Sequence, residues 1–428
     1  MNLLLQSAIC NLKSEISITG SKSETNRILL LQALFPDITL ANTSNSDDSE
    51  VMQKALGLNS QFPPETAGSN SQLPTPNFQL IDIHHAGTAM RFLTAYFAVK
   101  EGHAVILTGS PRMKERPIKV LVEALQQLGA QISYENEEGF PPIKIVGQKI
   151  TNNKVSIPAN VSSQYISALL LIAPKLENGI ELTLVGEITS IPYIKMTLAL
   201  LNDLNIQTSF EGNIIKVSPK LEVESKVMTV ESDWSSASYF FSLTALSEIG
   251  TQITLSSYKQ NSLQGDSALV EIYKNLGVET VFENNSIVLR RSAPEASGLQ
   301  SLICDLNSSP DIAQTIVVTC LGLGIGCHLT GLHTLKIKET DRLEALRIEL
   351  TKLGANISVT NDSLTLLATK EINSNVKIAT YNDHRMAMAF APLALKVPIT
   401  IENAEVVSKS YPDFWEDLKS IGFKISQI

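Results

Sequence analysis

The chain has 428 residues, more than a single hydrophobic core usually serves, so two or three domains are expected. Hydrophobic residues make up 43% of the chain and charged residues 18%, which is typical of a globular protein and excludes a disordered one. The formal net charge of −9 argues against a protein that mainly grips nucleic acid or anionic lipid. Any anionic ligand must therefore be held by locally concentrated cations.

The N-terminal segment, MNLLLQSAICNLKSEIS, has no basic start, and Gln6 interrupts its short apolar run. We predict a first β-strand there rather than a signal peptide. The cysteines form no CxxC pair, which favours a reducing compartment and small buried thiols; they are Cys10, Cys304, Cys320 and Cys327.

An amphipathic segment followed by a Gly or Asn, a short strand, a polar turn and a second strand recurs along the chain. The residues predicted to end the six helices lie 68 to 77 residues apart: Gly57, Gly129, Asn205, Gly277, Gly354 and Gly422. Gly or Asn is expected there because helices commonly end on a left-handed residue. The sequence thus predicts an α/β protein of six modules, three to a domain, with a boundary near residue 232. The polar stretch 59–77 is predicted to be a surface insertion in the first module.

Three groups of small and cationic residues occur in the first third of the chain. GSKSETNR (20–27) is predicted to be a strand-to-helix turn, where helix N–H groups and the cations bind anions. In HHAGTAMR (84–91), Gly87 and Thr88 are predicted to open an apolar helix. TGSPRMKERP (108–117) places three cations in five positions, which in isolation is also typical of a solvated basic loop.

Four more elements follow. VSSQY (161–165) offers hydroxyl and amide donors. The stretch from Ile312 to Leu335 lacks charged residues, but its glycines favour a buried helix followed by a strand over a membrane span. KIKETDR (336–342) and YNDHRMAMAF (381–390) each combine acids with arginine, and in the second Asp383, His384 and Arg385 are predicted to precede an apolar helix. A lone histidine such as His384 is more often structural than catalytic.

The strings GSKSETNR, AGTAMR, TGSPRMKERP, VSSQ, PDIAQT, KETDRL, YNDHRMAM and KSYPDF span residues 20–414 and together resemble the 5-enolpyruvylshikimate-3-phosphate synthase family. The resemblance implies the enolpyruvyl transferase fold, with two similar domains of three βαβαββ modules that close over a site between them. We expect the first domain, mainly on the shikimate 3-phosphate side, at 20–232. The second, with acid–base and phosphoenolpyruvate residues, is expected at 1–19 and 233–428.

The resemblance also implies site residues. Shikimate 3-phosphate is expected to contact Lys22, Ser23, Arg27, Ser162, Ser163, Gln164, Ser190, Tyr193, Asp311 and Lys338. Phosphoenolpyruvate is expected to contact Lys22, Gly87, Arg91, Arg116, Gln164, Arg342, Arg385 and Lys409. The expected catalytic residues are Asp311 as base, Glu339 as acid, Lys22 and His384. No metal or cofactor is expected, and the enzyme is expected to be a cytoplasmic monomer without nucleic-acid or membrane partners.

The sequence departs from the family pattern at two positions in this region, where His85 replaces an Asn and Phe92 a Pro, so the response to glyphosate stays open. Thr334 stands where many members have an Asn. Two alternatives remain: a UDP-N-acetylglucosamine enolpyruvyl transferase, which typically carries a cysteine in the loop of TGSPRMKERP, and a non-catalytic ligand-binding relative. No cysteine lies between Cys10 and Cys304, and the acids and cations are all present.

Overall fold

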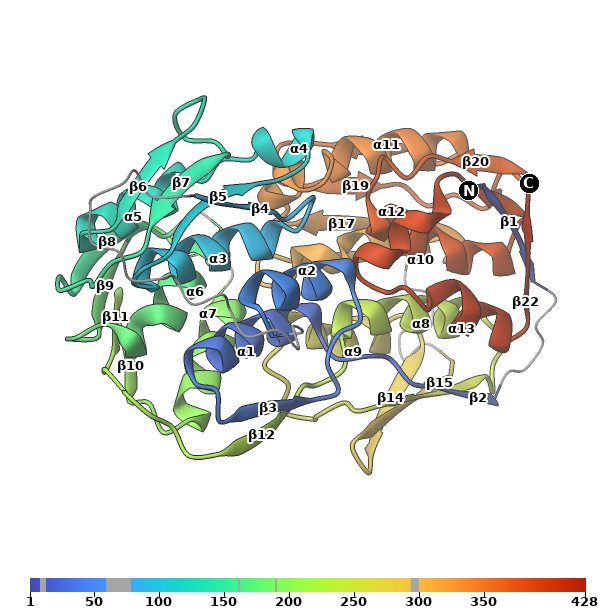
Figure 1. The fold of residues 1–428 in the computed structure, drawn as a ribbon. Helices are drawn as coiled ribbons and strands as arrows, with labels where there is room; N and C mark the ends of the chain where they lie inside the picture. Colours follow the sequence, from blue (N-terminus) through green and yellow to red (C-terminus); the bar gives the residue numbers. More distant parts are fainter. Residues whose placement is uncertain (8–12, 59–77, 161, 189–190, 294–299) are drawn as a thin grey trace. The chain divides into compact units, whose positions relative to one another are not determined.

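The computed structural model describes residues 1–7, 13–58, 78–160, 162–188, 191–293 and 300–428 (Figure 1). These residues form two compact units, one of Met1–Ser21 with Glu231–Ile428 and the other of Lys22–Val230. We call them the terminal unit and the inserted unit, and each has its own hydrophobic core. The predicted insertion at 59–77, together with Cys10, lies outside the described residues.

The inserted unit alternates helices and short strands. Its elements are α1 (Lys22–Leu34), β3 (Ile38–Ala41), α2 (Asp47–Leu56), β4 (Gln79–Asp82), α3 (Gly87–Val99), β5 (Ala104–Thr108), α4 (Pro111–Lys114), α5 (Lys119–Leu128), β6 (Gln131–Tyr134), β7 (Ile143–Val146), β8 (Lys154–Pro158), α6 (Ser163–Ile172), η1 (Ala173–Lys175), β9 (Ile180–Val185), α7 (Ile191–Asp203), β10 (Thr208–Glu211), β11 (Ile214–Val217) and β12 (Lys226–Thr229).

The terminal unit repeats the alternation. Its elements are β1 (Leu3–Ser7), β2 (Lys13–Ile16), α8 (Trp234–Leu246), β13 (Gln252–Ser256), η2 (Gly265–Ala268), α9 (Leu269–Lys274), β14 (Val278–Glu283), β15 (Ser286–Arg291), β16 (Ser301–Asp305), η3 (Pro310–Ile312), α10 (Ala313–Leu323), β17 (Gly326–Thr330), η4 (His333–Ile337), α11 (Arg342–Lys352), β18 (Ile357–Val359), β19 (Leu364–Leu366), β20 (Val376–Ile378), α12 (His384–Phe390), η5 (Ala391–Leu395), β21 (Ile399–Ile401), η6 (Ala404–Lys409), α13 (Phe414–Ser420) and β22 (Phe423–Gln427).

One sheet pattern recurs. In the order β4-β5-β7-β6, the first two strands are parallel and joined by α3, and the last two form an antiparallel hairpin. The orders β8-β9-β11-β10 and β16-β17-β19-β18 repeat it. In the terminal unit, β1 pairs antiparallel with both β21 and β22, so the two chain ends lie in one sheet (Figure 1). Among the described residues β3 pairs with β12 alone.

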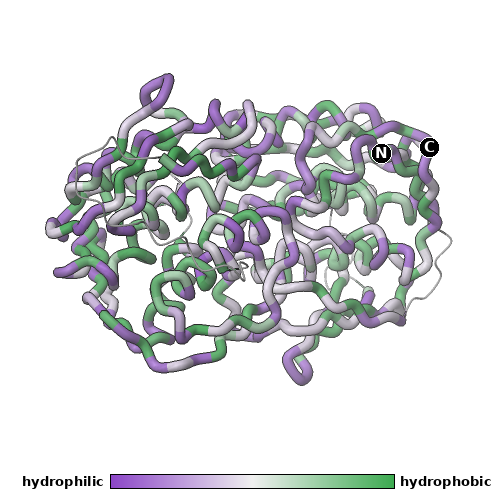
Figure 2. Tube along the Cα trace, viewed as in Figure 1, coloured by the Kyte–Doolittle hydropathy of each residue, from purple (hydrophilic) through white to green (hydrophobic). Residues whose placement is uncertain are grey.

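Each unit buries its central helices. Every residue of α8 is buried, as are nearly all of α3 and α6, which agrees with the near absence of charged residues in these segments, where Arg91 of α3 is the one exception. Along the trace, hydrophobic helices contrast with hydrophilic turns such as the tip of the β6–β7 hairpin (Figure 2). Strands with one face exposed alternate between exposed and buried residues, as in β8, where Val155 and Ile157 are the buried ones.

Several sequence predictions are confirmed. The six predicted helix-ending residues all have positive φ, from 56° at Asn205 to 108° at Gly129. The N-terminal run forms β1, and the uncharged stretch forms the buried helix α10 followed by β17. No helix in the described part of the chain is long and apolar enough to cross a membrane. One detail was wrong: His384 and Arg385 do not precede the apolar helix α12 but form its first turn.

Candidate active site

In the terminal unit, three carboxylates surround one buried arginine, Arg342, the first residue of α11. Its Nε lies 2.6 Å from Asp383 Oδ2, its Nη1 2.8 Å from Asp311 Oδ1, and its Nη2 2.8 Å from Glu339 Oε2. Burial alone would lower the pKa of Arg342, but Asp383, Glu339 and Asp311 outweigh it and raise the pKa. The guanidinium is therefore a fixed cation that holds both predicted acid–base carboxylates.

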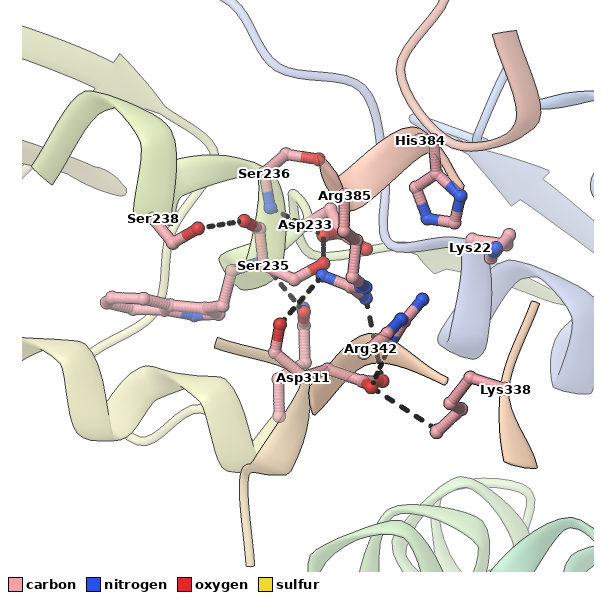
Figure 3. Close-up of polar contacts among 12 residues, drawn as sticks. Lys22, Asp233, Ser235, Ser236, Ser238, Asp311, Lys338, Arg342, His384 and Arg385 are labelled. Atoms are coloured by element: carbon pink, nitrogen blue, oxygen red, sulfur yellow. Dashed lines mark hydrogen bonds and ion pairs between the residues drawn. The ribbon is translucent and has the colours of Figure 1, made fainter. Parts of the chain in front are cut away.

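The Asp311 carboxylate contacts three cationic side chains of this unit (Figure 3). Besides Arg342, its carboxylate lies 3.3 Å from Lys338 Nζ and 3.6 Å from Arg385 Nη2, and Arg385 Nη1 donates to its backbone carbonyl at 3.4 Å. Burial would raise the pKa of Asp311, but Lys338, Arg385 and Arg342 hold it well below its ordinary value. Asp311 is thus ionised at neutral pH, and its basicity is low.

Helix caps place these side chains. Asp341 caps α11 by accepting from Glu344 N at 3.2 Å, and Asp383 caps α12 by accepting from Arg385 N at 2.9 Å. Each cap puts an arginine into a first turn, where free N–H groups and the helix dipole favour anions.

The remaining predicted residues of the terminal unit lie on or beside α12. His384 is buried, with its Nδ1 3.9 Å from Asp383 Oδ1. Lys409 donates to the Asn382 carbonyl at 2.6 Å, next to the same helix.

In the inserted unit, α1 begins at Lys22, whose Nζ lies 3.5 Å from Asp48 in the first turn of α2. Arg27, one turn further along α1, is buried and donates to Thr197 Oγ1, Ser167 Oγ and the Ser23 carbonyl at 2.9, 2.9 and 2.7 Å. Its guanidinium lies 5.9 Å from the centre of the Tyr193 ring. Burial lowers the pKa of Arg27 to about 10, so it remains charged at neutral pH.

A second cationic group in the same unit surrounds the start of α3. Arg116 packs so closely on Gly87 that a β-carbon at residue 87 would lie 2.5 Å from Arg116 Nη1. Two residues before Gly87 in the chain, His85 Nε2 lies 3.8 Å from Asp47 Oδ2. Glycine at residue 87 allows the Arg116 guanidinium to take this position, because any side chain there would displace it.

The hydroxyl and amide donors gather at α6. Ser162 caps the helix by accepting from Gln164 N at 3.3 Å, and Ser163 is its first residue. Gln164 Nε2 donates to Thr88 Oγ1 of α3 at 3.1 Å, which links the two helix starts. Ser190 lies outside the described residues.

The structure therefore brings predicted residues together within each unit: Lys338, Glu339, Arg342, Arg385 and Asp311 in one, and Gly87, Arg116 and Gln164 in the other, where Gln164 reaches the start of α3 through Thr88. The predicted site residues left out three acids that interact with them: Asp383 pairs with Arg342, Asp48 lies 3.5 Å from Lys22, and Asp266 interacts electrostatically with Arg385. Asp383 stands inside the quoted NDHR motif and could have been found, whereas Asp48 and Asp266 carry no signal in the sequence. In the described part of the chain no group of three His, Cys, Asp or Glu residues could hold a metal ion.

Comparisons with known proteins define first the class and then the family. A solved structure entitled EPSP synthase, from Acinetobacter baumannii, superposes over 100% of both chains with a TM-score of 0.77 at 20% identity, which establishes the two-domain enolpyruvyl transferase fold. The family model for EPSP synthase (3-phosphoshikimate 1-carboxyvinyltransferase) matches residues 7–418.

Two curated relatives carry that same name. The protein of Bacteroides fragilis (strain YCH46) is 44% identical over 98% of both chains, and that of Histophilus somni (strain 2336) is 36% identical over 98% of this chain and 99% of its own. The chain belongs to the EPSP synthase family.

Proposed function

We propose that this chain carries out the reaction of its family. As a 3-phosphoshikimate 1-carboxyvinyltransferase, it transfers the enolpyruvyl group of phosphoenolpyruvate to the 5-hydroxyl of shikimate 3-phosphate and releases phosphate, a step of aromatic amino-acid biosynthesis. The observation that carries the proposal beyond family membership is the Arg342 cluster, which fixes Asp311 and Glu339 on one guanidinium.

The reaction is an addition followed by an elimination. Asp311 takes the proton of the 5-hydroxyl while Glu339 protonates the methylene carbon of phosphoenolpyruvate, and the 5-oxygen bonds to the central carbon. Loss of a proton from the new methyl group and departure of phosphate then restore the double bond. A carboxylate that gives a proton in the first step can accept one in the second. Lys22 and His384 are proposed to assist by stabilising the phosphate that leaves.

The cations divide between the substrates by chemistry. Shikimate 3-phosphate is proposed to contact Lys22, Ser23, Arg27, Ser162, Ser163, Gln164, Ser190, Tyr193, Asp311 and Lys338, and phosphoenolpyruvate to contact Lys22, Gly87, Arg116, Gln164, Arg342, Arg385 and Lys409. Arginine suits carboxylate and phosphate because its planar fork binds two oxygens at once. This supports a function with anionic substrates in a protein whose net charge is −9.

The test measures phosphate release with phosphoenolpyruvate and either shikimate 3-phosphate or UDP-N-acetylglucosamine as acceptor. We expect turnover with the first acceptor only, and turnover with the second alone would favour the alternative transferase. Asp311→Asn and Glu339→Gln should each lower kcat on the order of 10²-fold or more. Glu271→Gln, an exposed carboxylate of the same unit, is the matched control. Full activity in either active-site variant would remove its assigned role.

We further infer a cytoplasmic monomer. Three described cysteines, Cys304, Cys320 and Cys327, are free thiols, which is typical of a reducing compartment. Light scattering coupled to size-exclusion chromatography should give the chain mass of 46.6 kDa, and twice that mass would contradict the inference.

A further inference from the structure

The guanidinium of Arg91, one turn into α3, donates hydrogen bonds to two backbone carbonyls. Its side chain is buried, with 4% of the residue exposed. Nη1 donates to the Gly87 carbonyl at 3.1 Å and Nη2 donates to the Pro117 carbonyl at 3.2 Å. The cation also lies 5.8 Å from the centre of the Tyr165 ring, and Nη1 lies 3.7 Å from Met113 Sδ. The two carbonyls belong to segments 30 residues apart in the sequence.

The Gly87 and Pro117 carbonyls both lie next to the contact between Gly87 and Arg116. Gly87 is the residue on which the Arg116 guanidinium packs, and Pro117 directly follows Arg116 in the chain. By holding both, Arg91 fixes the start of α3 against the loop that carries Arg116. Tyr165 of α6 adds a second tie, because its hydroxyl donates to the same Pro117 carbonyl at 2.5 Å. The Pro117 carbonyl thus accepts from two side chains of different helices.

The geometry leaves Arg91 poorly placed to bind an anion itself. Both terminal nitrogens are engaged by backbone oxygens, and the buried Nε has no hydrogen-bond partner among the described residues. Two of its five N–H donors are committed to backbone carbonyls and the residue is only 4% exposed, so little of the guanidinium is open to a phosphate or carboxylate.

We propose that Arg91 is a positioning residue that acts on phosphoenolpyruvate through Arg116, with Tyr165 as its partner in the same clamp. This rests on the proposed function, in which Arg116 contacts phosphoenolpyruvate. Lysine cannot replace Arg91, because a single ammonium group does not span the two carbonyls as a planar fork does.

The test is a double-mutant cycle on the full-length enzyme. Arg91→Lys should raise KM for phosphoenolpyruvate on the order of 10-fold, the usual loss for a hydrogen bond to a charged group. The kcat should change much less, and the affinity for shikimate 3-phosphate should stay unchanged. In an Arg116→Lys background the same Arg91→Lys change should add little, because the residue through which it acts is already altered. Tyr165→Phe should raise KM in the same direction and show the same non-additivity.

Arg112→Lys is the matched control, since Arg112 lies in the same loop but is exposed and pairs only with Glu115 at 2.8 Å in the described contacts; its KM should equal that of the wild type. Equal multiplication of KM by Arg91→Lys in both backgrounds, or no change in KM, would overturn the inference. If Arg91→Lys does not fold, the Tyr165→Phe cycle decides alone, and additivity there overturns it. An unchanged KM in Arg116→Lys itself would instead remove the proposed role of Arg116, so the two failures are distinguishable.

Discussion

At Gly87, the first residue of α3, the Arg116 side chain packed on the backbone leaves no room for a β-carbon. A β-carbon at residue 87 would lie 2.5 Å from Arg116 Nη1 and 3.0 Å from its Cζ, far inside normal contact. The flexible arginine would move and leave the backbone in place. Gly87→Ala should therefore fold normally and raise KM for phosphoenolpyruvate at least several-fold, while KM for shikimate 3-phosphate changes little. Steady-state kinetics with each substrate varied in turn checks this, and equal increases in both KM values would contradict it.

The carboxylates around Arg342 could be predicted only in part from the sequence. The motifs predicted Arg342, Asp311 and Glu339 as site residues, and the structure joins all three at 2.8 Å. The NDHR motif contains Asp383 but does not identify it as the third carboxylate of Arg342, because a contact across 41 residues depends on how α11 and α12 pack.

At the scale of elements, Asp383 serves α11 and α12 together. It caps α12 and pairs with Arg342 at the start of α11, and it is fully buried. Asp383→Asn keeps a capping side chain but removes one of the three carboxylates around the buried Arg342 guanidinium. Because Asp311 and Glu339 remain, we expect a loss of unfolding free energy of about 3 kcal/mol, at the low end for a broken buried ion pair. Asp341→Asn is the control: it caps α11 from a half-exposed position, and Asn is an equally good cap, so its loss should stay below about 1 kcal/mol. Similar losses in urea denaturation would contradict the buried pairing.

The helix-ending glycines differ in what surrounds them, although the repeat makes them look equivalent. At Gly129 (φ 108°) the nearest atom to a β-carbon would be 4.0 Å away, so Gly129→Ala should cost only the backbone strain, about 1–2 kcal/mol. At Gly277 (φ 81°) the β-carbon would collide with Arg291 Nη1, which donates to the Leu276 carbonyl at 2.6 Å. Gly277→Ala should therefore lower the urea midpoint of its unit by more than Gly129→Ala lowers that of its own. Equal shifts would show that strain alone sets the cost.

At the scale of the whole molecule, one buried acid should shape the pH dependence of stability. Burial is the main cause that raises the pKa of Asp266 from 3.8 to about 7; Asp311 and Asp233 add to it, and Arg385 and Lys338 oppose it. The folded state then binds a proton that the unfolded state has already released, so this group lowers stability as pH rises from about 4 to 7. The full effect is about 4 kcal/mol at 1.36 kcal/mol per pKa unit.

Asp266→Asn removes that proton, so the variant should lose less Tm than the wild type between pH 5 and pH 8. Asp362→Asn, at an exposed turn, should follow the wild-type profile. Parallel Tm profiles for all three proteins would show that Asp266 does not stay protonated in the fold.

The sequence by itself determined the modules, because helix periodicity, left-handed Gly or Asn ends and strand alternation are local properties of a few adjacent residues. It also determined the family, since the motifs are contiguous strings. The tertiary structure decided which carboxylates share Arg342, which serines and threonines hold Arg27, and that Arg91 faces backbone carbonyls. Apart from the local Arg342–Glu339 and Arg91–Gly87 contacts, these contacts join residues 26 to 170 positions apart, and no local rule specifies which distant partner a buried polar group meets when the helices pack.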